Sequence, residues 1–172
     1  MKASLLSSLK PVAALLLACF AGVVSASDHY QMAIVQATPG AADIQNGAIE
    51  QGLLELNSAS RAKADLFGKT MALCVANTRL AEYESATPAC NRAVHLARTN
   101  ALASSAERRE MQALALTNRG VMHWVSLDVA KAQQDFQRAA KLSDSKLVQN
   151  NLQQFEGRLE TLMASATAST LP

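Results

Sequence analysis

A pattern that repeats at a fixed step constrains this chain more than any other sequence feature. When the 172-residue sequence is shifted by 34 residues, Gly47 falls on Ala81 and Leu56 falls on Cys90. The Cys90 position recurs 46 residues later as Phe136, so about 12 residues are inserted between the last two units. A repeat of this length predicts helical hairpins that stack, because one hairpin alone cannot bury its apolar face.

Apolar periodicity and end signals predict where the helices lie. Ser104 and Glu107 have the spacing of a capping box, and Ser143 and Asp144 offer caps for a last helix through Leu162. The predicted helices are Ala48–Asn57, Ala64–Leu80, Glu84–Arg98, Ser104 to about Ser126, Val129–Leu142 and the last helix. We therefore expect an all-α fold, a short stack of antiparallel helical hairpins closed by a C-terminal capping helix.

Four parts of the chain are expected. Residues 1–26 read as a signal peptide, 27–40 as an N-terminal arm, 41–163 as the helical repeat domain, and 164–172 as a flexible tail. In the arm, His29–Val35 favours an isolated extended segment that Pro39 and Gly40 end.

The first 26 residues have the three parts of a secretory signal. A basic start is followed by the apolar run Pro11–Val24, and small residues precede a cut expected after Ala26. The run has 14 residues, whereas a membrane span needs roughly 20. Leu16–Cys19 resembles a lipobox, and its use would instead lipidate Cys19 and tether the protein to a membrane. We expect a periplasmic or secreted protein.

The net charge of the chain gives no support to one class of partner. Without Lys2 and Lys10, the remaining 14 basic residues balance 14 acidic ones, so the mature chain is neutral. A neutral chain gives no reason to expect nucleic acid or an anionic membrane surface as its partner.

Two stretches of the body resemble the tetratricopeptide repeat. One runs from Leu73 to Val94 and contains Leu-Cys-Val-Ala, Leu-Ala-Glu-Tyr and Ala-Cys-Asn-Arg-Ala-Val; the other runs from Asn118 to Ala139. The chain is also similar to small exported tetratricopeptide proteins of Gram-negative bacteria, over about residues 47–142. The resemblance implies a right-handed stack with a concave groove, and it names no partner, because this fold hosts many. Leu127 departs from the pattern, since the family usually has Gly there.

Two cysteines remain in the mature chain, Cys74 and Cys90, and the repeat register places them on the two helices of one hairpin. An exported protein favours a structural disulfide between them. Two buried free thiols or a redox-active pair are the alternatives, although the spacing is not the C-x-x-C of redox motifs.

No pattern points to catalysis. The three histidines are scattered, and the sequence has no H-E-x-x-H, no phosphate-binding glycine loop and no G-x-S-x-G. We expect no enzyme activity, no cofactor and no metal.

A binding groove is the remaining functional hypothesis. Trp124, the only tryptophan, suits an interface, although a lone Trp at helical spacing is also typical of a core. Arg79 and Asn118 are candidates for binding a peptide carboxylate. The predicted groove consists of Met71, Val75, Thr78, Arg79, Leu114, Thr117, Val121, Trp124 and Val125.

The sequence thus favours a periplasmic interaction module that binds an unidentified protein or peptide in this groove. The alternative is a structural accessory subunit of an envelope complex, or a homodimer. The first unit, Gly47 to Ala59, motivates that alternative, because it has only the second half of the repeat and would expose an apolar face.

Overall fold

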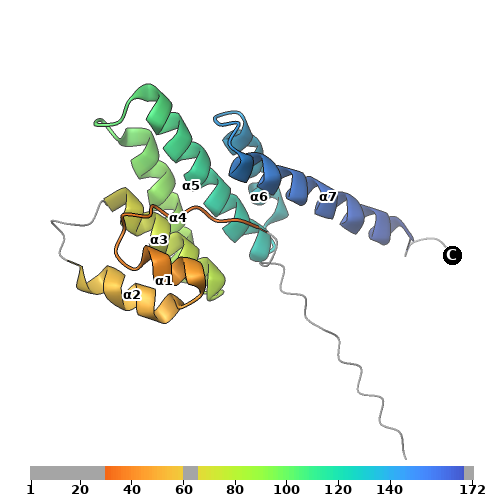
Figure 1. Ribbon diagram of the computed structural model, residues 1–172. Helices are drawn as coiled ribbons and strands as arrows, with labels where there is room; N and C mark the ends of the chain where they lie inside the picture. Colours follow the sequence, from red (N-terminus) through yellow and green to blue (C-terminus); the bar gives the residue numbers. More distant parts are fainter. Residues whose placement is uncertain (1–29, 60–65, 169–172) are drawn as a thin grey trace, which may run out of the picture.

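The computed structural model describes residues 30–59 and 66–168, and within these ranges it contains seven α-helices and no strand (Figure 1). Three parts of the chain lie outside the described ranges: residues 1–29, with the predicted signal peptide, Cys19 and His29; residues 60–65, where the predicted helix Ala64–Leu80 begins; and the last four residues. The helices are α1 (Ala41–Asn46), α2 (Ile49–Ser58), α3 (Leu66–Arg79), α4 (Tyr83–Thr99), α5 (Ser105–Val125), α6 (Val129–Ala140) and α7 (Lys146–Ala168). The prediction of an all-α stack of helical hairpins is confirmed.

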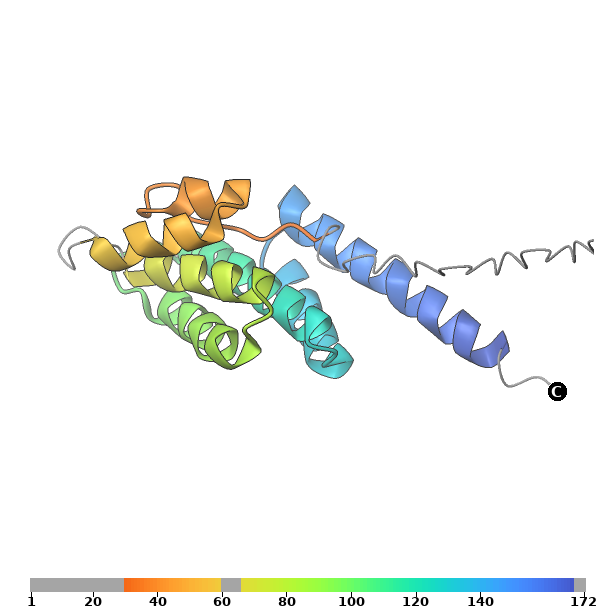
Figure 2. The same cartoon turned by 90° about the horizontal axis from the view of Figure 1, so that it is seen from below.

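Three hairpins, α1–α2, α3–α4 and α5–α6, pack in sequence, and α7 covers the last one (Figures 1 and 2). Their turns are built alike: one residue has a positive φ, and the N–H of the next residue bonds to the carbonyl five residues earlier. The positive φ angles are 93° at Gly47, 57° at Ala81 and 67° at Leu127. The bonds run from Ala48 to Asp43 (2.9 Å), from Glu82 to Asn77 (2.9 Å) and from Asp128 to His123 (2.8 Å).

These three turns are spaced by the same 34 and 46 residues that the sequence shift gave. The packed positions repeat with them, because Leu56, Cys90 and Phe136 are all buried. Gly120 lets α6 approach α5 closely: a Cβ at this glycine would lie 3.0 Å from the Phe136 ring. The repeat register read from the sequence therefore holds in three dimensions.

The predicted capping box of α5 is also confirmed. The Glu107 N–H donates to the Ser104 hydroxyl at 3.2 Å, and the Ser104 N–H donates to the Glu107 carboxylate at 2.7 Å. The Ser104 backbone N–H, and after it the Ser104 side chain, stabilise the charged carboxylate and lower the pKa of Glu107. The insertion between the last two units falls in the longer α4 and α5 and the loop that joins them.

Two expectations about the ends of the domain need correction. The first unit is not a half repeat, because the six-residue helix α1, which the sequence did not predict, pairs with α2. At the other end, α7 continues to Ala168, five residues into the expected flexible tail. Figure 2 shows the far half of α7 extending beyond the other helices.

Candidate functional site

The chain's own arm lies across the predicted groove. The segment Tyr30–Val35 runs in extended form over α3 and α5 (Figure 1), and we call it the arm segment. It packs against four buried members of the predicted groove, namely Met71, Val75, Val121 and Trp124. The arm segment therefore covers residues that the sequence predicted to line a partner-binding groove.

Two buried asparagines hold the backbone of the arm segment. Asn118 of α5 accepts a hydrogen bond from the Ala33 N–H at 2.8 Å and donates one to the Ala33 carbonyl at 2.8 Å. Asn151 of α7 does the same for Gln31, at 3.0 Å and 2.6 Å. Both asparagines are fully buried. Each side-chain amide thus makes the paired N–H and C=O bonds that a neighbouring strand would make with one residue.

The expectation that Arg79 and Asn118 bind a peptide carboxylate is not supported by their positions. Asn118 is engaged with the Ala33 backbone. Arg79 instead donates to the carbonyls of Ile44 (2.5 Å) and Gln45 (3.3 Å) at the end of α1. Its guanidinium therefore satisfies unpaired carbonyls of a helix C-terminus.

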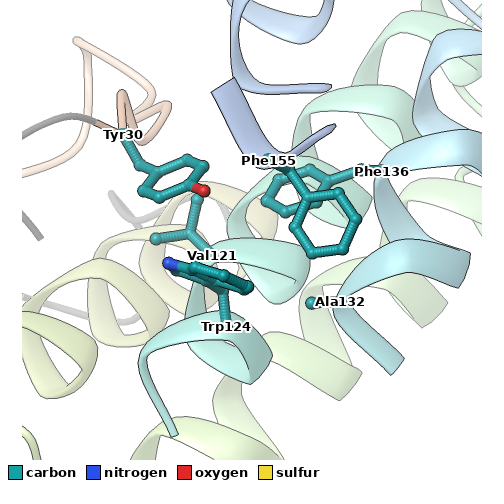
Figure 3. Close-up of a cluster of buried hydrophobic side chains, with 6 residues drawn as sticks. All are labelled: Tyr30, Val121, Trp124, Ala132, Phe136 and Phe155. Atoms are coloured by element: carbon teal, nitrogen blue, oxygen red, sulfur yellow. The ribbon is translucent and has the colours of Figure 1, made fainter. Parts of the chain in front are cut away.

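The start of the arm segment enters an aromatic cluster (Figure 3). The Tyr30 ring stacks on Phe136 with centroids 5.8 Å apart and lies 6.1 Å from Trp124. Phe155 of α7 meets Trp124 edge to face at 5.3 Å. Burial of the Tyr30 hydroxyl raises its pKa to about 12, and the nearby Arg158 opposes that shift.

Trp124 is 8% exposed, so it is a core residue by burial. One edge of it nevertheless borders a cavity of about 480 Å³ between the α5–α6 turn and the far half of α7, which we call the α7 pocket. The α7 pocket is lined by Trp124, Val125, Leu127, Val129, Arg158, Thr161 and Leu162. Two members of the predicted groove, Trp124 and Val125, therefore reach an open surface.

The remaining members of the predicted groove face other surroundings. Thr117 and Thr78 are buried, and their hydroxyls donate to carbonyls one turn earlier in their own helices. Leu114 is half-buried between the clusters around Phe67 and Leu116. Thr78 and Thr117 therefore support the helix packing, whereas Leu114 borders a shallow hollow beside the α4–α5 loop.

Cys74 and Cys90 form a disulfide across the α3–α4 hairpin, with their Cα atoms 4.7 Å apart. Both residues are fully buried, next to Ala86 and Met122. Of the three hypotheses for this pair, the structure bears out the disulfide.

A polar cluster lies on the outer side of α5 and α6. The Arg119 guanidinium binds the buried Asp135 carboxylate through two hydrogen bonds of 2.6 and 2.7 Å, and a third, of 2.9 Å, joins it to Asn91. Nε2 of His123 is 4.0 Å from Asp135. Burial lowers the pKa of His123, and the negative charge of Asp135 opposes that shift.

The described residues hold neither a candidate metal site nor a candidate membrane span. Neither range contains a cluster of three or more His, Cys, Asp or Glu residues able to hold a metal ion. The described helices also include none that is long and apolar enough to span a membrane. In comparisons with known proteins, no protein family, no curated protein and no solved structure matches this chain.

Sequence reasoning missed Asn151 and the role of Asn118. A buried asparagine carries no local signal, since its partner here lies 85 or 120 residues away in the chain. The only hint was Asn118 itself, a polar residue on an otherwise apolar helix face.

Proposed function

We propose that this protein is an exported protein-interaction module, built on a tetratricopeptide-like stack, that docks a partner protein on the α7 pocket. The observation that carries the proposal is an open apolar surface beside a filled groove. Leu127, Leu162 and Met163 are 85%, 52% and 63% exposed, and the first two line the α7 pocket. Large exposed apolar side chains that gather around a cavity are typical of interaction sites.

The lining of the α7 pocket indicates the chemistry of the partner. It is apolar except for Thr161 and Arg158, and Arg158 sits 6.0 Å from the centre of the Tyr30 ring. Among the described residues no carboxylate forms an ion pair with Arg158. The surface therefore fits an apolar segment of a partner protein with a carboxylate beside Arg158.

Two features support a site of action outside the cytoplasm. One is the sequence of residues 1–26, with its basic start and apolar run. The other is the Cys74–Cys90 disulfide, since structural disulfides persist in oxidising compartments.

Site-specific photo-crosslinking in the native host tests the proposal. A photo-reactive residue replaces Leu162 in the α7 pocket, and the matched control replaces the exposed Glu84 of α4. We expect one dominant heterologous adduct from position 162 and none from position 84. Adding Leu127→Asp, a change at an exposed position, should abolish the adduct because it places a charge in the apolar surface.

The other outcomes contradict the proposal in distinct ways. A self-adduct from position 162 would favour the homodimer alternative, with the α7 pockets of two copies facing each other. An adduct that is equally strong from both positions, or that survives Leu127→Asp, would show that the α7 pocket is not the docking surface.

A further inference from the structure

The arm segment is held as a bound peptide would be held. Its residues Gln31 and Ala33 each make two backbone hydrogen bonds, and all four bonds go to side chains of α5 and α7. In an extended chain the N–H and C=O groups of residues two apart point to the same edge. One row of side chains along that edge can therefore hydrogen-bond to both residues. The contact is made to groups that every non-proline residue carries.

The side chains of the arm segment add a preference for particular residue types to this backbone contact. The Gln31 side chain is exposed, so that position is open to any residue that keeps the backbone N–H, which excludes only proline. Tyr30 and Met32 pack into the aromatic cluster, whereas Ala33 and Val35 pack against the cluster around Phe67 and Met71. The segment carries no charge. The site therefore suits a neutral extended segment with an aromatic residue, a second apolar residue two positions on, and a small residue after it.

The polar groups of the groove depend on having an occupant. Asn118 and Asn151 are fully buried, and their amides meet the arm backbone with both donor and acceptor. Loss of the arm would leave these amide groups without those partners, and an unsatisfied buried polar group is unfavourable. Another extended backbone would restore the same four hydrogen bonds.

We infer that the groove between α3, α5 and α7 is a binding site for an extended peptide, and that Tyr30–Val35 is its tethered, exchangeable occupant. The tether is the short stretch from Gln36 to Pro39, in which Gln36 and Ala37 are exposed. A short tether keeps its occupant at an effective concentration in the millimolar range, so free peptide competes poorly while the tether is intact. This site adjoins the α7 pocket, because Trp124 contacts the arm segment and also lines that pocket, but it does not depend on the function proposed for the pocket.

The experiment cuts the tether after the protein has folded. A protease recognition sequence is inserted between Gln36 and Ala37 of the full chain, and the folded protein is cleaved and diluted. Trp124 reports occupancy by its fluorescence, since it is the only tryptophan and its ring lies 6.1 Å from Tyr30. We expect the fluorescence to change on dilution and to return, saturably, when a synthetic peptide of residues 30–36 is added, while the helical circular dichroism stays constant.

Two N-methylated peptides form the matched control. Methylation at Gln31 and Ala33 removes both N–H donors to the asparagines, and we expect at least a tenfold weaker affinity. Methylation at Met32 and Ile34 adds the same groups to the intervening residues and should weaken binding less. The difference in affinity between the two methylated peptides should be smaller when the cleaved protein carries Asn118→Ala.

Three results would overturn the inference. The cleaved arm could stay bound at every dilution, or leave only as the helices unfold, and either result would make it a fixed structural element. Equal affinities of the two methylated peptides would show that hydrogen bonds from the peptide backbone to the asparagines do not contribute to binding. The peptide comparison uses the cleaved protein with an unsubstituted groove, so it remains decisive even if Asn118→Ala does not fold.

Discussion

The hairpins α3–α4 and α5–α6 have the same turn geometry and the same repeat register, but different side chains fill the space between their two helices. A step of 46 residues places Cys74 on Gly120 and Cys90 on Phe136. In the first hairpin a disulfide joins the two positions, and in the second the Phe136 ring lies against the glycine. The same gap between two helices is thus closed once by a covalent bond and once by an aromatic side chain.

The difference teaches how each hairpin depends on its neighbours. A disulfide stabilises its own hairpin by limiting the unfolded chain, whatever surrounds it. The Phe136 ring instead stacks on Tyr30 of the arm and meets Phe155 of α7 at 5.3 Å (Figure 3). The second hairpin therefore shares its core with the arm and the capping helix, which are the elements that carry both proposed sites.

Removal of the Phe136 ring should have the largest effect on stability. We expect Phe136→Ala to lower the free energy of unfolding by about 3–5 kcal/mol, because a fully buried aromatic side chain leaves a cavity. Urea denaturation followed by circular dichroism measures the change. The neighbouring exposed Gln137 provides a control, since Gln137→Ala should change stability by less than about 0.5 kcal/mol. A Phe136→Ala loss as small as that of the control would refute the shared core.

Removal of the disulfide comes next. The variant Cys74→Ala/Cys90→Ala should lose about 3 kcal/mol, which the chain-entropy relation gives for a loop of this length. The same urea experiment measures it, and the reduced wild-type protein should unfold at a similar midpoint. If reductant leaves the midpoint of the wild-type protein unchanged, the disulfide does not stabilise the hairpin.

The turn of the second hairpin offers a small gain. Leu127 has a φ of 67° and is 85% exposed, so its backbone is strained and little packing of its side chain compensates for that strain. Leu127→Gly should stabilise the protein by about 0.5 kcal/mol. The strain energy relieved in the left-handed backbone conformation exceeds the conformational-entropy cost that glycine adds on folding. Leu127→Ala removes the same apolar surface but keeps the strained conformation. If thermal unfolding shows an equal gain for both variants, backbone strain is not the cause.

The smallest expected effect is a pH dependence. The step of 46 residues places Asn77 on His123, and burial lowers the pKa of this histidine against the opposing charge of Asp135. Asp128, Arg119 and Lys131 also face it, with effects that oppose one another. Because the unfolded chain then binds a proton more readily than the folded one, stability should fall as the pH drops below about 6.5.

His123→Asn, which installs the residue of the first hairpin, should flatten that dependence between pH 7 and pH 5. Urea midpoints across this range measure it. The control His95→Asn removes an exposed imidazole from α4 and should leave the wild-type profile unchanged. A profile that stays as steep in His123→Asn as in the wild type would assign the dependence to other groups.

The sequence by itself determined the repeat and its buried positions. The turns at Gly47, Ala81 and Leu127, and the cap at Ser104, depend on residues within a few positions of each other. The burial of Leu56, Cys90 and Phe136 follows from periodicity, because a helix presents the same face at each repeat. Local and periodic signals such as these can be read without knowing the fold.

Only the tertiary structure decided what the groove holds and where the surface stays open. The arm segment has no partner near it in sequence, since Asn118 and Asn151 lie 85 and 120 residues away from the residues that they bind. The length of α7 and its position past the α5–α6 turn leave Leu127 and Leu162 around an open pocket. Contacts between distant segments depend on how whole helices dock, and no spacing along the chain encodes that outcome.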